Sequence, residues 1–152
     1  MFDTWTIPKE LFDWIRQNLP DGKTILELGS GNGTDELRKH YTVYSIEHDP
    51  KWLKPNNNYI YAPIVSYNGY FWYDVSKLNN LPEYDLLLVD GPTGTIGRRG
   101  FVNHRALFNL EVPIVIDDTH RKAEMAMAED LSRILNCKLT IHLNNGRGFS
   151  TL

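Results

Sequence analysis

The chain has 152 residues, of which 41% are hydrophobic and 23% are charged, and its formal net charge is −3. This composition is typical of globular proteins and indicates one domain, residues 1–152, with a packed core. The acidic balance argues against general nucleic-acid binding, which requires a basic excess. The only cysteine, Cys137, excludes an internal disulfide, and no apolar run is long enough to span a bilayer. Because the first residues also lack a signal-peptide pattern, we expect a cytoplasmic protein.

Residues 7–19 predict the first helix, since apolar side chains recur there at helical spacing. Thr6 could cap this helix, Pro8 suits its first turn, and Pro20-Asp21-Gly22 would end it. We expect this helix to pack beside the first strand.

A glycine-rich turn follows the first predicted strand, residues 24–28, and precedes a helix predicted over residues 35–40. Its glycines lie two residues apart, at Gly29, Gly31 and Gly33. Glycine has no Cβ and tolerates positive φ, so the backbone amides of such a turn can approach a ligand closely. A dinucleotide-binding turn reads G-x-G-x-x-G, and here Thr34 stands where its third glycine would be.

The second predicted strand, residues 41–47, ends at Glu47, eighteen positions after Gly29. An acidic residue near this spacing binds ribose hydroxyls in nucleotide-binding α/β folds, because a carboxylate accepts hydrogen bonds from both hydroxyls. A solvated acid at a strand end is the alternative for Glu47. His48-Asp49-Pro50 then turns the chain into a short helix around Trp52.

An aromatic-rich stretch extends from a third strand, predicted over residues 59–62 after an asparagine loop at 56–58, to Tyr73. Within it, Asn68-Gly69 between β-forming residues predicts a hairpin. The aromatic side chains have two interpretations: some line a pocket for adenine or substrate, or they close the edge of the sheet. Those that stay exposed would favour a homodimer.

Two further strands are predicted to end in acidic residues. The first, residues 84–90, is a continuous apolar run that ends at Asp90, and the second, residues 112–116, is followed by Asp117, Asp118 and His120. Carboxyl ends of parallel strands meet at one edge of the sheet, where α/β proteins build their sites. We therefore expect these side chains to converge.

The remaining segments complete the predicted order of elements. Helices are expected over residues 101–110 and in a segment that ends near Leu135, and residues 138–143 and 149–152 predict a closing β-hairpin. The loop of residues 91–100 contains Arg98 and Arg99, and it either grips an anion or is a solvated basic loop.

The pattern E-x-G-x-G-x-G, which begins at Glu27, resembles motif I of the class I S-adenosylmethionine (SAM)-dependent methyltransferases. The resemblance covers essentially the whole chain. It implies an α/β, Rossmann-like, doubly wound sheet of seven mostly parallel strands with an antiparallel C-terminal strand. It also implies a SAM site in which Glu27 lies near the methionine amino group and Glu47 binds the ribose. The residues expected to contact the cofactor are Glu27, Gly29, Ser30, Gly31, Asn32, Gly33, Glu47, His48 and Asp90.

The acidic strand ends resemble two groups within that superfamily. Val89-Asp90-Gly91-Pro92 and Asp117-Asp118 are similar to segments of small methyltransferases without an assigned substrate, and also to the metal-dependent O-methyltransferases of the catechol and caffeoyl-CoA type. The second resemblance implies a divalent cation such as Mg²⁺ at Asp90, Asp117 and Asp118. The chain departs from that type in having Asp118 where Asn is common, and its fourth-strand loop lacks the usual lysine.

These patterns predict a SAM-dependent methyltransferase that transfers a methyl group to oxygen on a small-molecule acceptor. Asp90, Asp118 and His120 are the predicted catalytic residues, with His120 or Asp118 as general base if no metal is bound. Two close carboxylates repel, so either one is protonated or a cation lies between them. A nicotinamide-dependent oxidoreductase and a non-catalytic nucleotide-binding module are the alternative functions.

Overall fold

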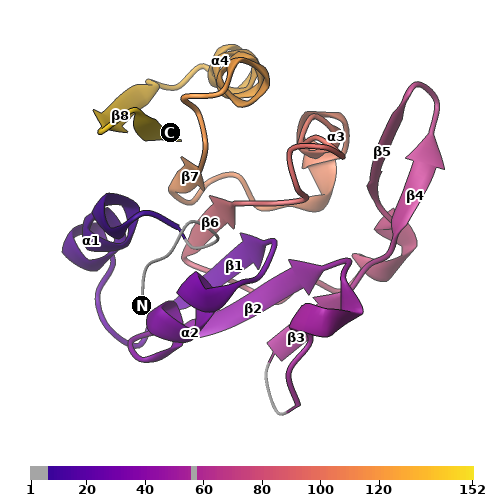
Figure 1. The fold of residues 1–152 in the computed structure, drawn as a ribbon, viewed down its shortest axis with the longest axis horizontal. Coiled ribbons are helices and arrows are strands. Elements are labelled where there is room, and N and C mark those ends of the chain that lie inside the picture. The colour runs from indigo at the N-terminus through magenta and orange to yellow at the C-terminus, as the bar shows by residue number, and fades with distance from the viewer. Residues whose placement is uncertain (1–6, 56–57) are drawn as a thin grey trace.

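The computed structural model describes residues 7–55 and 58–152, which form one mostly parallel sheet with helices on both faces (Figure 1). The sheet order is β3-β2-β1-β6-β7-β9-β8. Its strands are β1 (Thr24–Leu28), β2 (Thr42–Glu47), β3 (Asn58–Tyr61), β6 (Leu86–Val89), β7 (Ile114–Ile116), β8 (Thr140–Asn144) and β9 (Arg147–Thr151). The β1–β2, β1–β6, β2–β3 and β6–β7 pairs are parallel, whereas β9 is antiparallel to both β7 and β8. The predicted fold class is confirmed.

Two apolar layers enclose the sheet because the strands alternate their side chains between its faces. On one face, Ile25 and Leu88 pack against α1 (Lys9–Asn18) and α2 (Asn32–Arg38). On the other, Leu26 and Val89 belong to the cluster that includes side chains of α3 (Gly100–Asn103) and α4 (Lys122–Leu135). All four residues of β6 are buried, as expected for a central parallel strand covered on both sides.

The first helix begins at Lys9, two residues later than predicted, although Ile7 is already buried in the core. Thr6, the predicted cap, lies outside the described residues, as do two residues of the predicted loop at 56–58. A 3₁₀ turn over Pro50–Trp52 follows β2, and Asp49 caps it by accepting the Lys51 backbone N–H at 3.1 Å.

The predicted hairpin is confirmed as β4 (Ile64–Tyr67) and β5 (Tyr70–Tyr73). Trp72 and Tyr73 are fully buried, and Trp72 stacks on His104 with ring centroids 5.3 Å apart. Phe71, by contrast, is 58% exposed. The hairpin therefore supplies core aromatics between β3 and β6, where another doubly wound fold would place a helix.

The helix predicted over residues 101–110 is wrong in extent. It divides into α3 and a 3₁₀ turn over Arg105–Leu107, with His104 between them at φ −109° and ψ 20°. Seven residues of continuous helix would separate the Cα atoms of Phe101 and Phe108 by about 10 Å. The rings of Phe101 and Phe108 pack with centroids 5.1 Å apart, so the interrupted segment still brings both aromatics together in the core.

The closing hairpin is also tighter than predicted. Asn145 and Gly146 form a two-residue turn with φ values of 52° and 75°, so β8 ends one residue later and β9 begins two residues earlier than expected, although β8 also begins two residues later, at Thr140. Positive φ at both positions is typical of the type I′ turn that suits a twisted hairpin. As a result Arg147 lies in β9 rather than in a loop. No described helix has the length and apolar character needed to cross a membrane.

Candidate functional site

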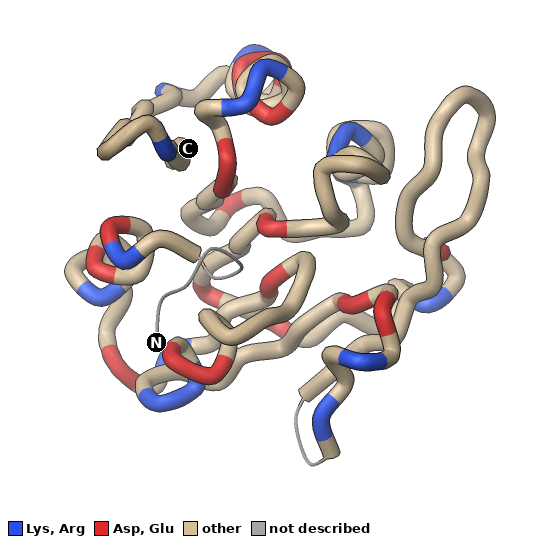
Figure 2. Tube along the Cα trace, in the orientation of Figure 1, with Lys and Arg blue, Asp and Glu red and all other residues tan. Residues whose placement is uncertain are grey.

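A cavity of about 660 Å³ lies at the carboxyl ends of β1, β2, β6 and β7. This volume falls within the range of small-ligand sites. The loops after these strands line it. Figure 2 shows several Asp and Glu positions in the central part of the molecule. The predicted site residues on its wall are Gly29, Ser30, Asn32, Glu47, His48, Asp90, Asp118 and His120.

The aromatic residues of the hairpin are not on this wall, so their interpretation as pocket residues is wrong. Trp72 and Tyr73 are instead fully buried in the core, where Trp72 packs against His104 and Phe108. Among the Trp, Tyr and Phe residues that the structure describes, Trp52, from the turn after β2, lines the cavity.

Gly29 lets two loops meet at the floor of the cavity. It has φ +87°, and a Cβ at this position would lie 2.7 Å from the Asp90 carbonyl oxygen. A Cβ on Gly91 would in turn lie 2.7 Å from the Gly29 Cα and 2.6 Å from the Tyr73 hydroxyl. The loops after β1 and β6 therefore approach each other at a distance that only glycine permits.

Glu47 fixes the second side of the cavity. One carboxylate oxygen accepts the Ser30 backbone N–H at 2.8 Å, and the other accepts those of His48 and Asp49, each at 2.8 Å. The residue is only 3% exposed. The carboxylate thereby joins the glycine turn to the end of β2, and Glu47 forms part of the cavity wall.

Glu27, Gly31 and Gly33 lie behind the turn rather than on the cavity wall. The Glu27 carboxylate accepts hydrogen bonds from the hydroxyls of Thr34 and Ser45, and burial raises its pKa to about 7. Thr34 also receives the Gly31 backbone N–H at 3.1 Å. A Cβ on Gly33 would lie 2.9 Å from Ile7, so this glycine allows the segment before α1 to pack against the turn.

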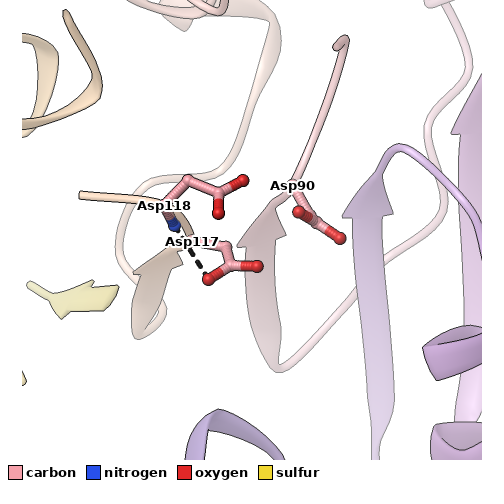
Figure 3. A group of neighbouring side chains, drawn as sticks. All are labelled: Asp90, Asp117 and Asp118. Atoms are coloured by element: carbon pink, nitrogen blue, oxygen red, sulfur yellow. Dashed lines mark hydrogen bonds between the residues drawn. The ribbon is translucent and has the colours of Figure 1, made fainter. Parts of the chain in front are cut away.

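The three predicted acids do converge (Figure 3). One carboxylate oxygen from each of Asp90, Asp117 and Asp118 lies within 4.8 Å of the others. Asp118 adopts φ 61°, a left-handed conformation that non-glycine residues seldom occupy outside strained or functional positions. Its backbone N–H donates to the Asp117 carboxylate at 2.8 Å. Asp117 is fully buried and is absent from the cavity wall.

Arginines surround these acids, which the sequence did not predict. Arg98 lies 3.0 Å from Asp118, and Arg147 lies 3.2 Å from Asp117. Arg121 contributes a third contact, at 3.4 Å from Asp118. The Asn145-Gly146 turn signal would have placed Arg147 on the strand beside Asp117, whereas no local pattern marks Arg98 as buried.

The close carboxylates perturb each other's ionisation. Burial and the charge of Asp117 raise the pKa of Asp90 well above its ordinary value, with the Arg98 guanidinium opposing the rise. Because a quarter of the Asp90 side chain remains exposed, this effect is smaller than for a fully buried acid. Burial and the neighbouring Asp118 likewise raise the pKa of Asp117, and Arg147 opposes them.

His120 lies on the cavity wall and is held through one ring nitrogen. Its Nδ1 accepts the Gly148 backbone N–H at 3.1 Å. In a neutral imidazole one ring nitrogen accepts a hydrogen bond and the other carries the proton. Because Nδ1 is the acceptor here, Nε2 carries the proton. His120 is thus arranged to donate a hydrogen bond into the cavity.

Comparison with solved structures identifies the fold. A Podospora anserina methyltransferase with bound S-adenosylhomocysteine (SAH) matches with a TM-score of 0.56 and 15% identity, over 93% of this chain and 75% of that one. A Staphylococcus aureus protein assigned as a caffeoyl-CoA O-methyltransferase matches with a TM-score of 0.59 and 14% identity, over 95% and 85%. The fold is that of the class I methyltransferases. The resemblance stated from the sequence is therefore confirmed at this level.

Several of the similar structures also contain Mg. The methyltransferase MycE of mycinamycin biosynthesis, in complex with Mg and SAH, matches with a TM-score of 0.55 and 14% identity, over 93% of this chain and 44% of that one. Neither the protein-family models nor the curated proteins contain a match to the sequence.

Proposed function

We propose that this protein is a SAM-dependent methyltransferase that methylates an oxygen atom of a small-molecule acceptor. The observation that carries the proposal is a single cavity with the glycine turn and Glu47 on one side and Asp90, Asp118 and His120 on the other. SAH-bound proteins of the same fold support a cofactor of this class. The cavity is large enough for both a nucleoside and an acceptor group.

The cofactor would lie across the carboxyl ends of β1 and β2. Glu47 would accept hydrogen bonds from the ribose hydroxyls, and Trp52 would offer its ring to the adenine. Gly29, Ser30 and Asn32, from the glycine turn, would contact the cofactor, and so would His48, from the end of β2. Glu27 would act from behind the turn, by holding Thr34 and Ser45 in place, rather than by direct contact with the methionine group.

Bound SAM would supply an electrophilic methyl group, so the protein must orient an acceptor oxygen and remove its proton. We assign proton removal to Asp90, which lies on the cavity wall with a partly exposed carboxylate. Asp118 is less suited, because its side chain is only 7% exposed, Arg121 contacts it, and Arg98 lies closer to it, at 3.0 Å, than to Asp90, at 3.5 Å. His120 would hold the acceptor by donating a hydrogen bond from Nε2, instead of acting as the general base.

The acceptor class and the assembly are parts of the same proposal. Lys and Arg residues are distributed over separate segments (Figure 2), which favours a small molecule over a nucleic acid. Most of the aromatic side chains that were expected to support a homodimer are not available as a contact surface, since Phe71 alone of residues 70–73 is more than half exposed. Exposed Ile141 and Leu143 on the edge strand β8 offer an alternative contact. The reduced cysteine Cys137 is compatible with a cytoplasmic location.

Isothermal titration calorimetry with SAM, SAH and NAD tests the central claim. We expect saturable binding of SAM and SAH and no binding of NAD. Glu47→Gln keeps the size of the side chain but removes its charge, and should weaken SAM binding by about tenfold or more. Glu129→Gln, which removes the same charge from an exposed position on α4, is the matched control and should bind normally.

The choice of Gln rather than Ala at Glu47 matters for the interpretation. Alanine would leave three partly buried backbone N–H groups without their acceptor, whereas Gln keeps one acceptor oxygen and loses the other to an NH₂ group. An unchanged melting temperature of Glu47→Gln is therefore required before its weaker binding is attributed to the lost charge. A wild-type protein that binds NAD but neither SAM nor SAH would overturn the proposal in favour of an oxidoreductase. Binding of SAM without methyl transfer to any hydroxylated acceptor would favour the non-catalytic module.

A further inference from the structure

The acids at the ends of β6 and β7 raise the question of which positive charge balances them. Three carboxylates within 4.8 Å of one another repel strongly, and their oxygens are ligands that Mg²⁺ or Ca²⁺ accepts. The MycE methyltransferase, of similar fold, contains Mg. A divalent cation is therefore the first candidate for this position.

We propose that Arg98 takes the place of that cation and that the site needs no divalent metal. The Arg98 Nη2 atom lies 3.0 Å from the Asp118 carboxylate and 3.5 Å from the Asp90 carboxylate. A metal ion that joined these two carboxylates would have to bind their oxygens at about 2.0–2.6 Å, in the space between them. The guanidinium already lies against both, and its charge would repel a second cation.

Arg98 is fixed in this position by the backbone around it. Its Nε donates to the Pro92 carbonyl at 3.1 Å, its Nη1 to the Asp117 carbonyl at 3.0 Å, and its Nη2 to the Asp90 carbonyl at 3.2 Å. The side chain is only 4% exposed. Movement of Arg98 away from the acids would break its hydrogen bonds to three carbonyl groups. Displacement of Arg98 by a metal ion would therefore carry a large free-energy cost.

The surrounding charges are balanced without a metal. Arg147 lies 3.2 Å from Asp117 and Arg121 lies 3.4 Å from Asp118, so three arginines face three carboxylates. Each guanidinium keeps its proton at any physiological pH, which makes this compensation permanent. Arg98 also joins the loop after β6 to the end of β7. It is thus a positioning residue that keeps Asp118 and Asp90 at fixed distances on the cavity wall.

Titration of the cofactor-free wild-type protein with Mn²⁺, followed by calorimetry and by electron paramagnetic resonance, tests this inference. We expect no stoichiometric binding in the micromolar range and no change in melting temperature with Mn²⁺ or EDTA. Arg98→Leu removes the charge that lies between Asp90 and Asp118, while Arg121 and Arg147 remain, and should bind Mn²⁺ at least tenfold more tightly than the wild type. Bound Mn²⁺ should then raise its melting temperature. Arg98→Lys retains a cation and should resemble the wild type.

Stoichiometric Mn²⁺ binding by the wild type that Asp90→Asn abolishes would overturn the inference. A folded Arg98→Leu protein that gains no Mn²⁺ affinity would also contradict it. If Arg98→Leu does not fold, the comparison of the wild type with Asp90→Asn still decides the matter. The inference concerns the site of the proposed methyl transfer, but Mn²⁺ binding is measured without SAM. Failure of the methyltransferase assignment therefore leaves this result interpretable.

Discussion

Replacement of Gly29 by alanine should destabilise the protein far more than the same change at Gly69. Both glycines have nearly the same positive φ, +87° at Gly29 and +88° at Gly69. At Gly69 a Cβ would meet no atom within 4 Å, whereas at Gly29 it would lie 2.7 Å from the Asp90 carbonyl oxygen. The pair therefore separates the cost of the conformation from the cost of the contact between the two loops.

The magnitudes follow from these two costs. A left-handed conformation destabilises an L-residue by about 1–2 kcal/mol. Alanine also lowers the conformational entropy of the unfolded chain, which stabilises the folded protein by about 0.4–1 kcal/mol. We therefore expect Gly69→Ala to lower the free energy of unfolding by about 1 kcal/mol. Gly29→Ala should lose about 1–3 kcal/mol more, because its Cβ overlaps backbone atoms that cannot rotate away. For a domain of this size the two losses correspond to a fall in melting temperature of roughly 2–4 °C and 5–15 °C.

Urea unfolding followed by circular dichroism measures both losses. Gly29 and Asp90 both line the cavity, so Gly29→Ala should also weaken SAM binding, which Gly69→Ala should leave unchanged. Equal losses of stability in the two variants would refute the argument that the loops after β1 and β6 require glycine at their contact.

Three further predictions concern ionisation, backbone conformation and assembly. Folding raises the pKa of Glu27 from 4.5 to about 7, so the folded state favours the protonated acid. Stability from this group is present below pH 4.5 and is lost as the pH rises through about 7. In urea unfolding measured between pH 4.5 and 7, the free energy of unfolding of the wild type should fall by up to about 3 kcal/mol because of Glu27. Glu27→Gln cannot ionise, so this part of the pH dependence should disappear. Asp118→Asn should keep more stability than Asp118→Ala in the same assay, because Asn tolerates the positive φ at this position. If a homodimer forms through β8, Leu143→Lys should yield monomers in light scattering, whereas Phe71→Lys should not; the reverse result would place the interface on the β4–β5 hairpin.

The sequence predicted the sheet well because its strongest patterns are local. The apolar run of β6 and the glycine turn after β1 determine their own structure, since each depends on side-chain polarity or on backbone freedom within a few residues. The convergence of Asp90 with Asp118 was also predictable, because parallel strands that end in acids bring those acids to one edge of the sheet.

The sequence failed where the outcome depends on tertiary contacts. Arg98 lies in a glycine-rich loop and would be a solvated residue on local grounds, but three carbonyl groups from two loops bury it. The hairpin aromatics could not be assigned either, because Trp72 is buried by residues distant in the sequence, among them His104 and Phe108. The position of Glu27 behind the turn also depends on tertiary contacts, because its carboxylate accepts hydrogen bonds from hydroxyls of α2 and β2.

The hairpin of β8 and β9 has a consequence for the newly made chain. Arg147 pairs with Asp117, Gly148 donates to His120, and the Ser150 hydroxyl lies 2.8 Å from that of Thr119. All three contacts come from residues that the ribosome adds after the rest of the sheet has been translated. Until they emerge, Asp117 has no Arg147 and His120 has no fixed tautomer. The wall of the cavity formed by Asp118 and His120 therefore depends on the last strand, whereas the contacts of Glu47 with the glycine turn come from residues translated much earlier.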